Sequence, residues 1–198
     1  MVKTGTIHTD GFQLVENIFD LDEFEDLKRQ LREATYLPFP LDKPQILYLA
    51  PVPKAYDDAL TIWAESIVES KLNQLRSFAR LNTEELDTNF RVHSDGKIYG
   101  TYPDIACVFY IDTREDSGTA FYESPIYGRT SALPEYNVHK DDDGNWHPYA
   151  KIHQKENSML IYNAALYHGR FPWKSYGQSK EDGRIVIVKF LKTIPGAF

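Results

Sequence analysis

The chain has 198 residues, enough for one ordinary domain, and 42% of them are hydrophobic against 26% that are charged. This balance excludes a disordered tail, a collagen-like repeat and a coiled coil. The formal net charge of −7 argues against nucleic-acid binding, which usually needs a basic face, and Cys107 as the single cysteine excludes an intramolecular disulfide.

The first residues lack the apolar stretch of a signal peptide, and no apolar run approaches the length of a membrane-spanning helix. We therefore expect a soluble, cytoplasmic protein without a membrane partner. No internal repeat or low-complexity linker interrupts the chain, so a single domain over residues 1–198 is expected. The oligomeric state stays open.

Two helices are predicted in the first half of the chain. Asp20 stands three residues before Glu23, which is the spacing of a helix N-cap with its capping box. The apolar stripe of this helix is formed by Leu21, Phe24, Leu27 and Leu31. Residues 37–44 contain three prolines and are expected as loop or extended chain, and residues 45–52 as a strand. Helical spacing of apolar residues predicts a longer second helix from about residue 57 to residue 80.

From residue 89 the pattern changes to short segments rich in β-branched and aromatic residues. Because no helical pattern separates them, they predict an antiparallel sheet arranged as a sandwich, barrel or jelly roll. The segments are 90–93, 105–112, 118–124, 158–166 and 184–191. Residues 125–157 have the composition of a long irregular loop, and loops of this length tend to be functional lids or disordered insertions.

His93 and Asp95 are the first candidates for chemistry. Residues two apart on a strand project to the same side, so both side chains could reach one metal ion. His168 lies just past another predicted strand. Two imidazoles and one carboxylate are the ligand set of a non-heme Fe(II) site, which leaves positions open for a co-substrate and oxygen.

Arg184 begins the last apolar segment of the chain. A buried arginine needs an anionic partner, and its planar fork suits a carboxylate. Tyr110, in another predicted strand, could add a phenolic hydrogen bond to the same anion. A small dicarboxylate that chelates the metal at one end and contacts Arg184 at the other would satisfy both groups.

Taken in order, these motifs resemble the Fe(II)/2-oxoglutarate-dependent dioxygenases, specifically the prolyl-4-hydroxylase-like branch. The resemblance covers about residues 89–192 and rests on VHSDG, IACVFYID, GTAFYES, YHGRFP and GRIVIVKF. It implies a mainly β (α+β) fold with a double-stranded β-helix, or jelly roll, as its core. The catalytic core would span residues 89–192, and residues 1–88 would form a helical support region.

The same resemblance makes His93, Asp95 and His168 the iron ligands, with Arg184 on the distal carboxylate of 2-oxoglutarate and Tyr110 assisting. It implies Fe(II), 2-oxoglutarate and O2, with ascorbate as a stimulant. The implied reaction hydroxylates an aliphatic carbon of a prolyl residue, another peptide residue or a free amino acid, and releases succinate and CO2.

Two features of the chain depart from the family pattern. The gap between His168 and Arg184 is longer than in many members. A tyrosine that members often carry well before the His-x-Asp motif is missing, and Tyr99 or Tyr102 could replace it.

Two alternatives to a hydroxylase stay open. One is an AlkB-type nucleic-acid oxygenase on the same fold, against which stand the acidic total and the single arginine in RIVIVKF. The other is a non-catalytic jelly-roll module that binds a metal structurally or not at all. The expected partner is a small molecule or a peptide, and the negative net charge favours a neutral or basic one.

Overall fold

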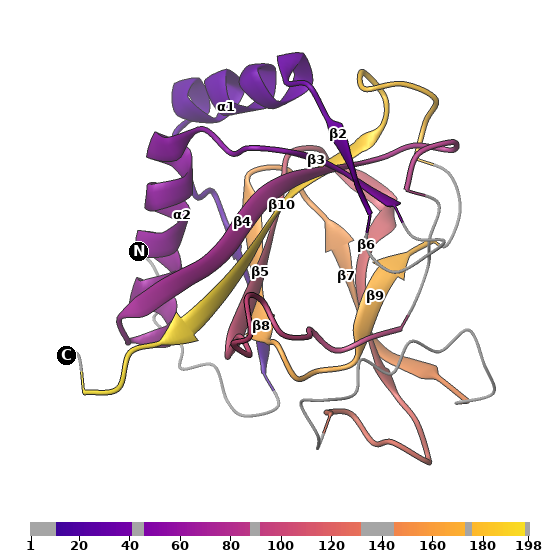
Figure 1. The fold of residues 1–198 in the computed structure, drawn as a ribbon. Helices are drawn as coiled ribbons and strands as arrows, with labels where there is room; N and C mark the ends of the chain where they lie inside the picture. The colour runs from indigo at the N-terminus through magenta and orange to yellow at the C-terminus, as the bar shows by residue number, and fades with distance from the viewer. Residues whose placement is uncertain (1–10, 41–45, 88–91, 132–144, 173–175, 197–198) are drawn as a thin grey trace.

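The computed structural model describes residues 11–40, 46–87, 92–131, 145–172 and 176–196. Within these ranges the chain forms a larger and a smaller β-sheet and two helices, α1 (Leu21–Glu33) and α2 (Lys54–Val68). Both helices lie at the side of the larger sheet that faces away from the smaller one (Figure 1). No helix in these ranges is long and apolar enough to cross a membrane.

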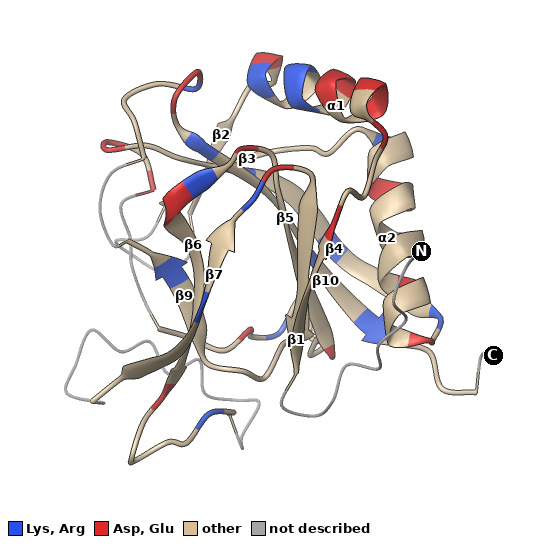
Figure 2. Ribbon diagram, turned by 180° about the vertical axis from the view of Figure 1, so that it is seen from behind, with Lys and Arg blue, Asp and Glu red and all other residues tan. Residues whose placement is uncertain are grey.

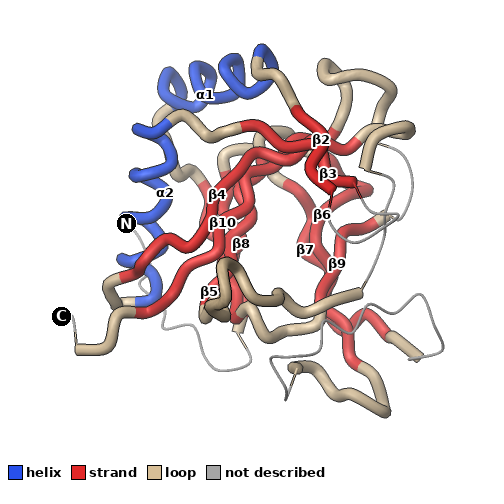
Figure 3. The backbone as a smooth tube through the Cα atoms, viewed as in Figure 1, coloured by secondary structure: helices blue, strands red, loops and turns tan. Residues whose placement is uncertain are grey.

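The strands of both sheets pair in antiparallel fashion. In spatial order, the larger sheet consists of β1 (Phe12–Glu16), β8 (Ser158–Asn163), β5 (Ile105–Tyr110), β10 (Arg184–Thr193), β4 (Leu72–Asn82), β3 (Ile46–Ala50) and β2 (Leu37–Pro40). The smaller sheet consists of β7 (His147–Gln154), β6 (Arg114–Glu123) and β9 (His168–Phe171). This arrangement (Figure 3) confirms the predicted mainly β fold with a jelly-roll core and buttressing helices.

Helix α1 begins where the capping pattern predicts. The Asp20 carboxylate accepts a hydrogen bond from the Glu23 backbone N–H at 2.9 Å, which satisfies one of the free donors of the first turn. Phe24, Leu27 and Leu31 are buried as expected. Leu21, the first helical residue, is 72% exposed, so its predicted place in the buried stripe is wrong.

The second predicted helix is only partly correct. Helix α2 ends at Val68, where Glu69 adopts a left-handed conformation with φ of 52°. Residues 72–82, which the apolar spacing assigns in large part to the helix, instead form the long strand β4 between β10 and β3. Local spacing was misleading here because pairing with the apolar strand β10 outweighs the helical propensity of a short segment.

The predicted strands at 105–112, 118–124, 158–166 and 184–191 are present as β5, β6, β8 and β10. Of the segment 90–93, His93 forms an isolated bridge, and residues 90 and 91 lie outside the described residues. The predicted loop over 125–157 is wrong in part, because residues 147–154 form β7 and pair with β6. The remainder of that segment includes residues 132–144, outside the described residues, so the lid stays a prediction.

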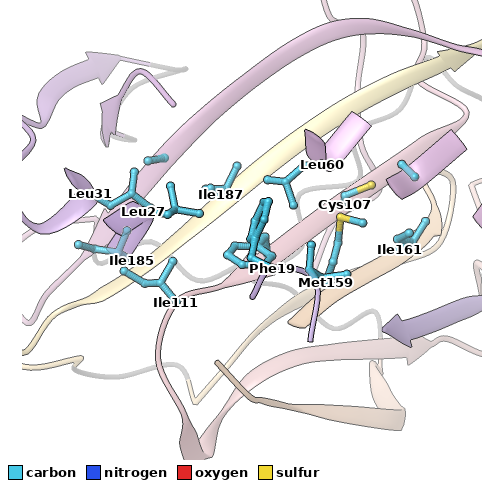
Figure 4. Close-up of a cluster of buried hydrophobic side chains, with 14 of the residues drawn as sticks. Phe19, Leu27, Leu31, Leu60, Cys107, Ile111, Met159, Ile161, Ile185 and Ile187 are labelled. Atoms are coloured by element: carbon cyan, nitrogen blue, oxygen red, sulfur yellow. The ribbon is translucent and has the colours of Figure 1, made fainter. Parts of the chain in front are cut away.

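A large apolar cluster lies between the helices and the outer face of the larger sheet (Figure 4). Leu27, Leu31 and Leu60 of the helices meet Ile185 and Ile187 of β10 in this cluster. A second cluster between the sheets contains, among others, Val108, Tyr110, Phe121, Tyr162 and Val186. The residues of β10 thus alternate between the two clusters, as the two-residue period of a strand requires.

Lys189 is the exception on the helix-facing side of β10, since it is charged and only 1% exposed. Its ammonium group forms an ion pair with the Asp57 carboxylate of α2. It also donates to the Asp57 carbonyl at 2.9 Å and to the Gln74 side-chain oxygen at 2.6 Å. All the donors of a buried ammonium group are therefore used, and they tie α2 to β10 and β4.

We predict that Lys189→Ala destabilises the protein by about 3–5 kcal/mol, because it leaves the Asp57 carboxylate uncompensated under the helix. Urea unfolding followed by circular dichroism measures this change. Lys54→Ala is the matched control, because Lys54 pairs with Asp58 on the same helix but is exposed, and its loss is expected to change the stability much less than the loss of Lys189. Equal effects of the two substitutions would contradict the structural role of Lys189.

Candidate metal centre and co-substrate cavity

The structure brings His93, Asp95 and His168 together. One possible ligand atom from each side chain lies within 4.8 Å of those of the other two, close enough to hold one metal ion. Backbone pairing fixes this arrangement: His93 and His168 exchange N–H···O hydrogen bonds of 2.9 and 2.8 Å, and the Asp95 N–H donates to the Ala164 carbonyl at 2.9 Å. Residues from distant parts of the chain are thus held side by side before any ligand binds.

The His168 ring presents a lone pair to the centre. Its Nδ1 lies 2.8 Å from the Leu166 carbonyl oxygen, and a carbonyl can only accept, so Nδ1 carries the proton. Nε2 is therefore the unprotonated nitrogen, and it lies 3.7 Å from Asp95 Oδ1. Burial lowers the pKa of His168 to about 4, which keeps the ring neutral. A neutral imidazole whose other nitrogen donates to a carbonyl is the usual form of a metal-binding histidine.

Asp95 contributes a carboxylate that lacks compensation. Its side chain is 6% exposed, and Oδ2 has no hydrogen-bond partner among the described residues. Burial raises the pKa of Asp95 to about 7, because the ionised form has lost its hydration. A cation between this oxygen and the two imidazoles would remove the penalty, so the donor set fits a divalent metal ion of the Fe(II) type.

A cavity of about 280 Å³ opens beside the three residues, between the two sheets. Its walls come largely from β4, β9 and β10, together with the segment 93–98. Arg184 lines this cavity and is 3% exposed. Its guanidinium donates from Nε to the Gln154 side-chain oxygen at 3.0 Å and from Nη1 to the Asn82 side-chain oxygen at 3.2 Å. Both partners are neutral, so the charge of Arg184 itself is not balanced by them.

Tyr110 lies near Arg184, with its ring centroid 6.0 Å from the guanidinium carbon. Its hydroxyl forms a hydrogen bond of 2.8 Å with the Thr119 hydroxyl, and Thr119 rather than Tyr110 lines the cavity. Burial raises the pKa of Tyr110 to about 12, so the phenol stays protonated. Tyr110 is therefore in position to act through Thr119.

The two tyrosines suggested as replacements for the missing family tyrosine do not line the cavity. Tyr99 is 83% exposed, and the Tyr102 ring lies against the Lys97 ammonium group at 5.1 Å. Tyr162 of β8 lies in the cavity wall instead, and its hydroxyl is 3.0 Å from His168 Nε2. Because Nε2 is unprotonated, the hydroxyl is the donor in this hydrogen bond, and a metal ion at Nε2 would take its place.

Sequence reasoning also missed three cavity arginines, Arg76, Arg80 and Arg170. Arg76 and Arg80 were missed because residues 72–80 were interpreted as part of a helix. Without the strand β4, nothing in the sequence placed their side chains in a cavity between two sheets. Arg170 had a usable signal, since it follows His168 by two residues and so shares its side of β9. Burial and the neighbouring Arg80 lower the pKa of Arg170 to about 10.

Neither the family models nor the curated proteins compared with this sequence gave a match. Several solved structures share the fold. HygX from Streptomyces hygroscopicus, with nickel, 2-oxoglutarate and hygromycin B bound, is 16% identical with a TM-score of 0.58, over 93% of this chain and 83% of HygX. The alpha-ketoglutarate-dependent epimerase SnoN from nogalamycin biosynthesis is 12% identical with a TM-score of 0.58, over 93% and 79% of the two chains.

A 2OG-Fe(II) oxygenase family oxidoreductase from Burkholderia pseudomallei is 12% identical with a TM-score of 0.59, over 96% of this chain and 88% of that chain. The chain therefore has the fold of the 2-oxoglutarate- and Fe(II)-dependent oxygenases. Its place in the prolyl-4-hydroxylase-like branch stays a prediction.

We predict that His168→Ala weakens binding of Co(II), a spectroscopic substitute for Fe(II), at least about 100-fold, since loss of even an outer hydrogen-bond partner can cost that much. Visible absorbance during titration of the metal-free protein measures the affinity. His147→Ala is the control, because His147 is exposed on β7 and its loss should leave the affinity unchanged. Tight Co(II) binding by His168→Ala would refute a role for this ring in metal binding.

Proposed function

We propose that this protein is an Fe(II)- and 2-oxoglutarate-dependent dioxygenase that hydroxylates an aliphatic carbon. The observation that carries the proposal is a group of two histidines and one carboxylate beside a cavity that contains the buried Arg184. The side chains of Asp95 and His168 are buried, and one Asp95 carboxylate oxygen is uncompensated. The shared fold supports it, as do the nickel and 2-oxoglutarate bound in HygX.

His93, Asp95 and His168 would hold Fe(II) through the two imidazoles and the Asp95 carboxylate. Bound Fe(II) and 2-oxoglutarate supply oxidative chemistry, in which O2 is consumed, 2-oxoglutarate becomes succinate and CO2, and a substrate C–H bond becomes C–OH. The Leu166 carbonyl fixes the His168 tautomer, so the ring needs no proton transfer before it binds a metal. The backbone pairing of His93 with His168 holds both rings in position.

Arg184 would bind the distal carboxylate of 2-oxoglutarate. Gln154 and Asn82 orient its guanidinium without neutralising it, so its charge remains available for an anion. Arg170 reaches the same end of the cavity from the opposite sheet, since it pairs with Thr119 across β9 and β6. The Tyr176 ring lies 5.2 Å from the Arg170 guanidinium carbon and 5.4 Å from that of Arg184, so both groups lie against the same ring.

Apolar side chains would keep water away from the reacting carbon. Phe78 on β4, Val108 on β5, and Val186 and Val188 on β10 line the cavity between its charged parts. An apolar wall restricts an oxidising centre to the substrate that it holds, and it strengthens the charge pairs in the cavity. The substrate is a small molecule or peptide in this proposal. Hygromycin B bound to HygX favours a small molecule.

The first test is an anaerobic titration of the metal-free protein with Fe(II) and 2-oxoglutarate. We expect a weak charge-transfer band in the visible range that requires both components, because only a chelated keto acid gives it. Succinate replaces 2-oxoglutarate as the control, since it lacks the keto group. A missing band, with Fe(II) loading confirmed independently, would leave the non-catalytic metal-binding module as the better description.

A second prediction concerns Arg184→Gln. We expect it to weaken 2-oxoglutarate binding by at least about 2 kcal/mol, or roughly 30-fold, because the distal carboxylate would lose one of the two guanidinium groups at its end of the cavity. Fe(II) affinity should not change. Titration of both variants by the charge-transfer band measures the effect, with Arg29→Gln on the exposed face of α1 as the control. An unchanged affinity for 2-oxoglutarate would show that the co-substrate binds elsewhere.

A further inference from the structure

The cavity is strongly cationic although the chain is acidic. Among the described residues that line it, five are basic, namely Arg76, Arg80, Lys97, Arg170 and Arg184, and Asp95 alone is acidic. The whole chain carries a net charge of −7. Two of the five, Arg170 on β9 and Arg184 on β10, come from different sheets; Figure 2 shows the two strands. The positive charge is therefore concentrated where a ligand would bind.

Three of these cations already have an assignment. Arg80 forms an ion pair with the buried Asp87, including a hydrogen bond of 2.7 Å from Nη2. Arg170 and Arg184 meet at the Tyr176 ring and are assigned to the distal carboxylate of 2-oxoglutarate by the function proposed above. The other carboxylate of 2-oxoglutarate would lie at the metal. One dianion thus accounts for this end of the cavity and leaves Arg76 and Lys97 without an anion.

Arg76 is held in place but not neutralised. Its guanidinium carbon lies 4.3 Å from the ring centroid of Phe39 and 5.1 Å from that of Phe78, so two aromatic faces fix the group. Among the described residues its contacts are these two rings, with no hydrogen bond and no carboxylate partner. Stacking on a ring leaves the edge of the guanidinium, which carries its N–H donors, available for an oxyanion.

The strand register separates Arg76 from the co-substrate end. Arg76 is paired with Phe190, whereas Arg184 is paired with Asn82, six residues further along β4. Both side chains nevertheless line the same cavity, as alternation along the two strands requires. Lys97, two residues after Asp95, adds a second positive charge to the lining beside the candidate metal ligands. A substrate that enters beside the metal would therefore meet Arg76 and Lys97.

We propose that the primary substrate is a small molecule with an oxyanion, a carboxylate or a phosphate, bound by Arg76 while 2-oxoglutarate occupies Arg170 and Arg184. This inference rests on the proposed function and names its substrate class. It favours a free amino acid or another organic acid over an interior residue of a peptide, which has no such anion. The net charge led us to expect a neutral or basic substrate. The inference differs because a bound substrate contacts the lining of the cavity, whose charge is opposite to that of the whole chain.

The test uses protein loaded with Ni(II) and saturating 2-oxoglutarate, and two probes of equal shape. Benzoate carries a carboxylate on an apolar ring that suits the wall of Phe78, Val188 and Phe190, and benzamide is its neutral counterpart. Isothermal titration calorimetry should give at least about tenfold tighter binding of benzoate, the worth of one charge-assisted hydrogen bond. Arg76→Gln should abolish this preference, and Arg76→Lys should retain part of it.

The affinity for 2-oxoglutarate separates this inference from the proposed function. Arg76→Gln should leave that affinity unchanged, whereas Arg170→Gln should weaken it and spare the preference for benzoate. Failure of 2-oxoglutarate to bind the Ni(II) form would refute the proposed function. If 2-oxoglutarate binds, the inference is overturned by equal binding of the two probes, by no binding of benzoate, or by a preference that survives in Arg76→Gln. Displacement of benzoate by single-stranded DNA at moderate salt would point instead to a nucleic-acid substrate.

Discussion

The cavity beside the candidate metal centre depends on the alternation of side chains along the paired strands β4 and β10. On β10, Ile185 and Ile187 face the helices, while Arg184 and Val186 face the cavity between the sheets. One face of these two strands therefore packs against the helices, and the other face lines the cavity. A register shift of one residue would place Arg184 under the helices and an isoleucine in the cavity. The ion pair between Lys189 and α2, on the helix side, helps to hold this register.

The candidate metal centre is arranged for binding a cation at some cost to the stability of the fold. Backbone hydrogen bonds define the positions of His93, Asp95 and His168, so the three side chains need little rearrangement to surround an ion. The arrangement has a cost, since Asp95 Oδ2 is buried without a hydrogen-bond partner among the described residues. Such a group is unfavourable in the fold alone and favourable once a cation is bound. The uncompensated Asp95 oxygen thus both costs stability and favours the binding of a cation.

Charged residues are distributed differently outside and inside the cavity. Outside the cavity, acidic and basic residues are mixed along α1 and in the loops at the ends of the strands (Figure 2). Inside it, Arg80 is paired with Asp87, whereas the guanidinium groups of Arg76, Arg170 and Arg184 lie against the rings of Phe39, Phe78 and Tyr176. Aromatic rings can fix a guanidinium without neutralising it, which keeps the charge for a ligand. The two stacked groups divide the cavity into an end suited to the co-substrate and an end suited to the substrate.

The residues by themselves predicted the fold class, the start of α1 and most strands after residue 100, because a cap and a two-residue period are local patterns. They also singled out His93, Asp95, His168 and Arg184 by their donor atoms, and the roles of these four residues stay predictions. Only the tertiary structure decided that residues 72–82 are a strand, that 147–154 pair with β6, and that Thr119 stands between Tyr110 and the cavity. It also revealed Arg76 and Arg170 as cavity residues. The physical reason is the same in each case. Strand pairing joins segments that are far apart in the chain, and the spacing of residues within one segment does not indicate which other segment it pairs with.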